Sequence, residues 1–99
     1  MKTTVAPAVL NQKGYQQVSD VSTASSLTVP PGSEVVLLQA ETQNIRWRDD
    51  GVAPTARIGM LLVAGASPFP YMGKNLESLQ FIEAVPTAKL NVAFYSVVS

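Results

Sequence analysis

Two arginines, two aspartates and the only Trp of the chain lie in five consecutive residues, Arg46-Trp47-Arg48-Asp49-Asp50. Guanidinium groups that flank an aromatic ring can stack with it on a base or a sugar ring. The two aspartates, together with Glu41, offer carboxylate oxygens to a hard cation such as calcium, which takes about six to eight oxygen ligands. The segment therefore has the residue types of a binding site, and its local structure decides whether it is one.

A strand through this segment places alternate side chains on opposite faces. The pattern then directs Ile45 and Trp47 into the core, leaves both arginines at the surface, and ends at the turn signal Asp50-Gly51. The alternating Asp spacing of a calcium loop is missing, so a turn in which the aspartates bond to backbone amides is the expected structure. We interpret Arg46, Arg48, Asp49 and Asp50 as interface residues, at a hairpin corner, with no metal.

The chain has no histidine and no cysteine, which removes Ser-His-Asp triads, Cys-His pairs and the usual zinc sites. Adjacent aspartates on a strand point to opposite faces, so they do not form the carboxylate pair of a glycosidase. Glu41, Glu77 and Glu83 give no further pairing pattern. The Gly73-Lys74 pair lacks the earlier glycine of a phosphate-binding loop, because Pro68 occupies that position. We expect no enzyme and no cofactor.

The composition is that of one domain with few charges. The chain has 99 residues, of which 46% are apolar and 14% charged, against roughly 25% charged in an average soluble domain. Seven basic and seven acidic residues give a net charge of zero, so no nucleic-acid partner is expected. The first residues contain no apolar run of a signal peptide or membrane anchor. We expect synthesis in the cytosol and no membrane partner.

Hydrophobic alternation predicts an all-β fold. Residues 1–17 show no period and are expected to form an extended N-terminal arm, whereas residues 18–99 are expected to form the domain. Phe69 and Tyr71 share one face of a strand whose prolines suit only a sheet edge, and they are either core residues or a contact patch. A small antiparallel β-sandwich of jelly-roll or Greek-key type follows. The predicted strands lie within residues 33–41, 44–50, 57–65, 66–75, 78–84 and 88–96, and short extended segments are predicted within residues 18–29.

The second half of the chain resembles small proteins encoded among the virion genes of tailed bacteriophages and prophages. The shared features are the run RWRDDG-x-x-PTA-x-x-G, a Leu-rich strand, Phe-x-Tyr-x-Gly, Leu-x-x-x-x-Phe-Ile and Ala-x-Leu-Asn-Val, and they cover residues 44–95. The resemblance implies a structural component of the virion and no active site. Proteins of this size and kind are commonly capsid decoration or cement proteins, often homotrimers.

The expected function is therefore to bind the assembled head, through the major capsid protein or other virion proteins, and to stabilise it as an oligomer. The protein would be made in the bacterial host cytoplasm and would end in the virion. Strands that are apolar on both faces agree with this, because a small core uses only one face and the other can meet a subunit. Two alternatives stay open. One is a tail, baseplate or fibre-attachment module, and the other is a carbohydrate-binding module in which Trp47 or Tyr71 is an exposed stacking platform.

Overall fold

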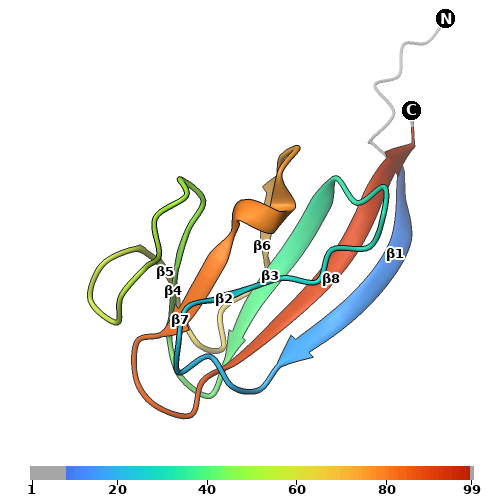
Figure 1. The fold of residues 1–99 in the computed structure, drawn as a ribbon. Coiled ribbons are helices and arrows are strands. Elements are labelled where there is room, and N and C mark those ends of the chain that lie inside the picture. Colours follow the sequence, from blue (N-terminus) through green and yellow to red (C-terminus); the bar gives the residue numbers. More distant parts are fainter. Residues whose placement is uncertain (1–8, 99) are drawn as a thin grey trace, which may run out of the picture.

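The computed structural model describes residues 9–98, which form eight β-strands and one 3₁₀ turn (Figure 1). The strands make two four-stranded sheets that enclose a single hydrophobic core. The elements are β1 (Val9–Val18), β2 (Ser25–Ser26), β3 (Val35–Glu41), β4 (Ile45–Arg48), β5 (Met60–Leu62), β6 (Phe69–Met72), the 3₁₀ turn η1 (Leu76–Ser78), β7 (Gln80–Glu83) and β8 (Lys89–Val98).

The predicted small antiparallel β-sandwich is confirmed. Sheet A has the order β1-β8-β3-β6 and sheet B the order β2-β7-β4-β5, and neighbouring strands are antiparallel. The pairs β1 with β8, β2 with β7, β3 with β6 and β4 with β5 are nested in the sequence. The first and third of these pairs lie in sheet A, and the second and fourth lie in sheet B. This is the strand order of a jelly roll.

The core lies between the two sheets and takes every second residue of the long strands. In β8, Leu90, Val92 and Phe94 are at most 1% exposed, as their alternation with polar neighbours predicts. Phe81 of sheet B packs in the same cluster. No polar or charged side chain among residues 9–98 is buried, so hydrophobic burial rather than a polar network holds the sheets together.

The N-terminal arm expected over residues 1–17 is wrong for residues 9–17. These residues belong to β1, which pairs with β8 from Val9 opposite Val98 to Val18 opposite Leu90. The sequence pattern did not predict this strand for two reasons. β1 is an edge strand whose side chains are mostly exposed, so backbone hydrogen bonds fix it and no apolar alternation is required. A bulge between Gln12 and Gly14 also interrupts the period of two. Residues 1–8 lie outside the described part of the chain.

β6 forms the opposite edge of sheet A, as its prolines predict. It pairs with β3 alone, with Leu38 opposite Phe69 and Val36 opposite Tyr71. Because Val36 and Leu38 belong to the core, Phe69 and Tyr71 are directed to the inner face of the sheet. Pro70, between them, cannot donate to a further strand.

Candidate interaction surface

β4 has the predicted alternation. Ile45 and Trp47 are 0% and 6% exposed, whereas Arg46 and Arg48 are half-buried on the other face. Trp47 is therefore a core residue of sheet B, and it is not an exposed platform for a sugar. The carbohydrate-binding alternative, so far as it relies on Trp47, is wrong.

The predicted aromatic pair of β6 meets Trp47 across the gap between the sheets. The Tyr71 ring centroid lies 5.6 Å from that of Trp47, edge-on at 83°, and the Phe69 centroid lies 5.9 Å from it at 39°. Such offset and edge-on pairs add about 0.5–1.5 kcal/mol to the burial of the rings. Phe69 is nevertheless 43% exposed. Phe69 therefore fits both predictions, because it packs on the core residue Trp47 and also exposes part of its ring to solvent.

Asp49 ties this aromatic cluster to the other sheet. The Tyr71 hydroxyl donates a hydrogen bond to the Asp49 carboxylate, at the end of β4. This bond, together with desolvation of the ring, raises the pKa of Tyr71 above its ordinary value, because both favour the protonated phenol. The hydrogen bond between Tyr71 and Asp49 therefore connects the edge strand β6 of sheet A to the end of β4 in sheet B.

Asp50 serves a different partner. Arg48 donates from Nε to Asp50 Oδ1 at 3.0 Å and from a terminal nitrogen to Oδ2, and the backbone N–H of Val52 donates to the same carboxylate at 3.4 Å. The hydrogen bonds from Arg48 are the main cause that lowers the pKa of Asp50 and raises that of Arg48. The pair closes the first turn of the loop after β4, as expected of an aspartate in a turn.

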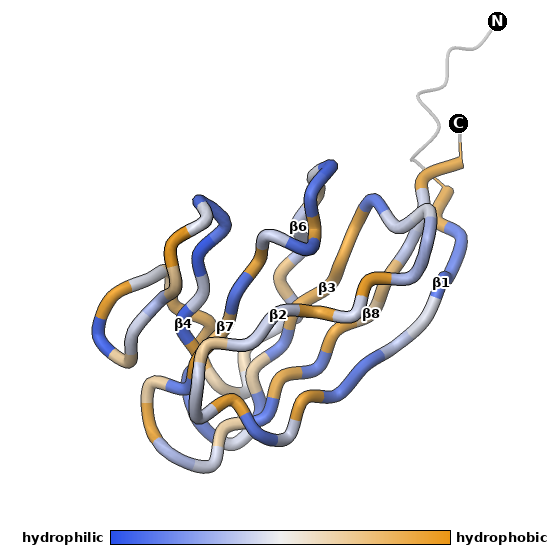
Figure 2. Tube along the Cα trace, viewed as in Figure 1, coloured by the Kyte–Doolittle hydropathy of each residue, from blue (hydrophilic) through white to orange (hydrophobic). Residues whose placement is uncertain are grey.

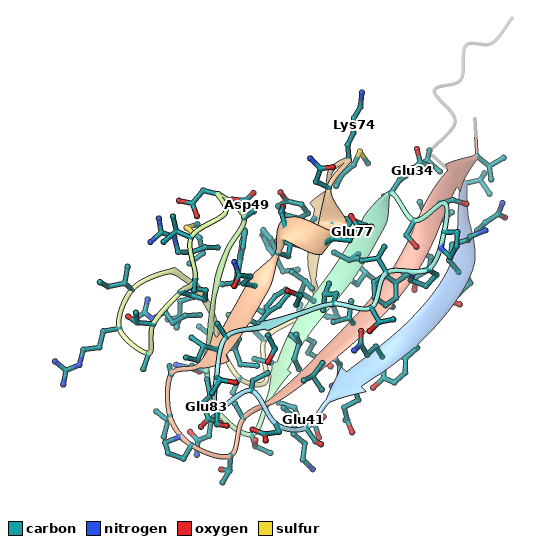
Figure 3. All side chains as sticks on the ribbon, in the orientation of Figure 1. Glu34, Glu41, Asp49, Lys74, Glu77 and Glu83 are labelled. Carbon is teal, nitrogen blue, oxygen red and sulfur yellow. The ribbon has the colours of Figure 1, made fainter. Side chains whose placement is uncertain are left out.

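The residues weighed as cation ligands are not brought together. Figure 3 shows Asp49 and Glu41 at opposite ends of the molecule, and the Glu41 carboxylate accepts a hydrogen bond from Asn91 at 2.9 Å. Within residues 9–98, no three His, Cys, Asp or Glu side chains cluster as metal ligands. Asp49 and Asp50 act as hydrogen-bond acceptors of the corner instead.

Arg46 lies under the long loop that joins β4 to β5. Its Nη1 donates to the carbonyl oxygen of Gly59 at 3.1 Å, and its buried Nε has no partner among the described residues. Gly59 has a φ of 144°, and a Cβ there would lie 3.1 Å from the Trp47 carbonyl oxygen and 3.3 Å from Pro54 Cβ. The loop can pack this closely on β4 only because position 59 has no side chain.

Beyond this corner the surface is apolar. Six large apolar side chains on β5, its flanking loops and the start of β6 are between 43% and 61% exposed, and we call them the apolar edge: Val52, Ile58, Met60, Leu61, Val63 and Phe69. Figure 2 shows part of this set as orange segments in the loop beside β4. A single exposed Leu needs no explanation. Six large exposed apolar side chains within residues 52–69, around the edge strand β5, favour an interaction surface.

Two separate hollows are lined in part by residues of the apolar edge. One, of about 240 Å³, is lined by Arg48, Asp49, Asp50, Ile58, Gly59 and Met60. The other, of about 200 Å³, lies between β3 and β5 and extends to Phe69. The predicted interface residues Arg48, Asp49 and Asp50 therefore line the first hollow together with Ile58 and Met60. Arg46 instead bonds to Gly59, and Tyr71 packs on Trp47.

The sequence did not single out the five aliphatic members of the apolar edge. The signal for four of them was the run RIGMLLVAG, residues 57–65, which is apolar at successive positions and so predicted a strand covered on both faces; Val52 lies before this run and had no signal. In the structure β5 has only three residues and sits at the edge of sheet B. Most apolar side chains of this run therefore remain exposed to solvent.

Comparison of the chain with known protein families, with curated proteins and with solved structures gave no match. In the described part of the chain, no helix has the length and apolar character needed to span a membrane.

Proposed function

We propose that this protein is a structural component of a tailed-phage virion, a decoration protein that binds the assembled head and stabilises it as a homotrimer. Its partners are the major capsid protein and further copies of itself. The proposal places the protein in the virion after synthesis in the bacterial host cytoplasm. The apolar edge is the observation that carries it: a 99-residue chain leaves six large apolar side chains at one side of its sandwich.

The chemistry of this edge supports attachment to protein rather than catalysis. Its only ion pair among the described residues is Arg48 with Asp50, in which each charge neutralises the other. Apolar contact with a polar rim, here the Arg48–Asp50 pair and the exposed Arg57 beside Ile58, is typical of subunit interfaces, where charged residues are depleted at the centre. The resemblance to virion proteins covers residues 44–95, and its specific motif, residues 46–59, includes this corner and the loop that follows it.

Repetition explains how so small a contact could stabilise a capsid. One domain of this size offers a limited area, and weak interfaces bury less than about 1,200 Å². When several copies are joined in an oligomer, each later contact with the lattice forms at high effective concentration. A trimer on a repeating shell would therefore bind far more tightly than one copy.

The proposal is tested by analysing purified particles of the phage or prophage that encodes this chain. The polypeptide is expected in purified virions by mass spectrometry, and cryo-electron microscopy is expected to show β-sandwich density on the outside of the head. Heads from a deletion strain should lose DNA at a lower temperature than wild-type heads. Absence of the polypeptide from virions would reject the proposal, and density on the tail alone would replace decoration by a tail, baseplate or fibre-attachment role.

The oligomeric state is tested separately by light scattering of the purified protein at two concentrations. A mass of three chains at both concentrations is expected. A mass of one chain at both would reject the trimer.

A further inference from the structure

A second surface, away from the apolar edge, covers the outer face of sheet A. The strand registers place Tyr15 opposite Ala93 and Leu37 opposite both Ala93 and Pro70, so these four residues form one row across all four strands. The next row joins Gln17, Asn91 and Gln39. An aromatic and aliphatic row thus lies beside a row of amides.

Tyr15 is the exposed aromatic side chain of this face. It is 62% exposed, and its hydroxyl donates to Asn91 Oδ1 at 2.6 Å. The hydrogen bond fixes the free end of the ring against the neighbouring strand, while most of the side chain meets solvent. A tyrosine held in this way loses little conformational freedom when a flat ligand packs on it.

Asn91 is the centre of the amide row. Its Oδ1 also accepts from Gln17 Nε2 at 2.9 Å, and its Nδ2 donates to Glu41 at 2.9 Å and to Gln39 Oε1 at 3.4 Å. Asn91 itself is saturated by these four bonds. Among residues 9–98, the Nε2 amide of Gln39 and the second carboxylate oxygen of Glu41 have no such partner, so a donor and an acceptor remain for a ligand.

These residues surround a hollow of about 130 Å³. Its lining is formed by Tyr15, Leu37, Gln39, Pro68, Asn91, Val92 and Ala93. The volume is below the roughly 300–1,000 Å³ of pockets for drug-sized ligands, so the hollow admits one ring. No residue of the lining itself is charged. The charged group bonded to it, the Glu41 carboxylate on Asn91, is an anion and therefore disfavours a phosphate or another anionic ligand.

We propose that this hollow binds a single neutral sugar residue of a glycan. A pyranose has an apolar face of C–H groups, which suits the Tyr15 ring and the aliphatic row, and a rim of hydroxyls that both donate and accept. Those hydroxyls match the free Nε2 amide of Gln39 in the lining, and Glu41, bonded to Asn91 outside the lining, offers a further acceptor beside the hollow. A second copy of the chain is the poorer occupant, because its apolar edge would cover the amide row and leave these groups without partners.

The inference does not depend on a place in the virion. A glycan site on the face of sheet A leaves the apolar edge free, so both surfaces can be occupied in one assembly. A protein that decorates no capsid could still bind sugar here, and the loss of either proposal leaves the other standing.

Chemical-shift titration of the ¹⁵N-labelled full chain tests the site. The probes are glucose, galactose, N-acetylglucosamine and rhamnose, each free and as the methyl glycoside, which represents a residue within a chain. Saturable shifts are expected for at least one methyl glycoside, with a Kd on the order of 1 mM. They should be confined to the amides around Tyr15, Gln39 and Asn91.

Three variants assign the binding to the named groups. Tyr15→Ala should weaken binding at least tenfold, Gln39→Ala several-fold, and Tyr15→Phe less than threefold because the ring remains. Val85→Ala, at a 46% exposed side chain outside both the hollow and the apolar edge, is the matched control and should leave the sugar affinity unchanged. Unshifted amides elsewhere in each spectrum show that the variant is folded.

Absence of saturable shifts with all eight probes would overturn the inference. So would equal affinity in Tyr15→Ala, or shifts on this face that appear on concentration without sugar, since these would show that a second copy covers it. Inorganic phosphate is the charged comparison probe, and equal shifts with phosphate would show non-specific contact rather than a sugar site.

Discussion

The edge strands at the two sides of this sandwich differ in length and in the side chains that they expose. At one side β1, a ten-residue edge strand, carries Lys13 and a bulge between Gln12 and Gly14. At the other side β5 has three residues and β6 four, and apolar side chains surround them. Charges and bulges on an edge strand discourage the addition of a further strand. The β1 side is therefore protected from the addition of a further strand, whereas the β5 and β6 side offers a group of apolar side chains for contact.

This difference separates two sources of stability. The protected side is held by the ladder between β1 and β8 and buries few side chains. The apolar side is built on Trp47, against which Phe69 and Tyr71 pack. We therefore expect substitutions behind the apolar edge to affect folding, and substitutions on it to affect association.

Trp47→Ala should have the largest effect. Deleting a large core aromatic side chain costs about 3–5 kcal/mol, because apolar burial is lost and a cavity remains. The matched change on the other side, Tyr15→Ala, removes a 62% exposed ring and should cost less than about 1 kcal/mol. Urea unfolding of both variants measures the difference. A cost below about 1 kcal/mol for Trp47→Ala would show that the inner face of β4 is misassigned.

Gly59→Ala should come next. The φ of 144° is unfavourable for a residue with a side chain, and the new Cβ would press on the backbone of Trp47 and on Pro54. Strain of this kind costs about 1–3 kcal/mol. Gly51→Ala, at a φ of 84° but with open space around its Cβ, separates the cost of the backbone angle from that of the close approach. Equal unfolding free energies of the two variants would mean that the loop does not pack on β4.

Leu61→Lys should weaken self-association at least tenfold, which corresponds to about 1.4 kcal/mol, while the monomer keeps its fold. The reason is that a charge at the centre of an apolar contact must be desolvated. Leu10→Lys on β1 is a close control, since Leu10 and Leu61 are 42% and 43% exposed. Sedimentation equilibrium of both variants decides between the two sides. Loss of association in Leu10→Lys alone would reverse the assignment of the interface.

Tyr71→Phe should have the smallest effect, about 0.5–1 kcal/mol at neutral pH, because a surface hydrogen bond is lost and the ring remains. The bond to Asp49 raises the pKa of Tyr71. Its stabilisation is therefore fully present below the ordinary tyrosine pKa of about 10 and is lost as pH rises through the raised value. Unfolding free energies measured from pH 8 to 11 should converge for wild type and Tyr71→Phe. A constant difference across this range would show that the bond does not form.

The strands that cross the core were predictable because burial imposes their pattern. Leu90, Val92 and Phe94 alternate with half-exposed residues, and Ile45 with Trp47 does the same. A period of two can arise only where one face is buried and the other is not. The edge position of Phe69 and Tyr71 was predictable for another reason, since Pro70 cannot take part in a ladder on both sides.

The sequence by itself determined the all-β class, the core face of the long strands, the turn at Asp50-Gly51 and the edge position of β6, because these follow from local alternation and backbone chemistry. Only the tertiary structure decided that residues 9–17 are a strand, because their partner β8 lies at the other end of the chain. It also decided which surplus apolar residues stay exposed beside β5, and that Tyr15 and Asn91 meet across 76 residues of sequence. Pairing between distant segments depends on how the whole chain closes, and no local pattern records it.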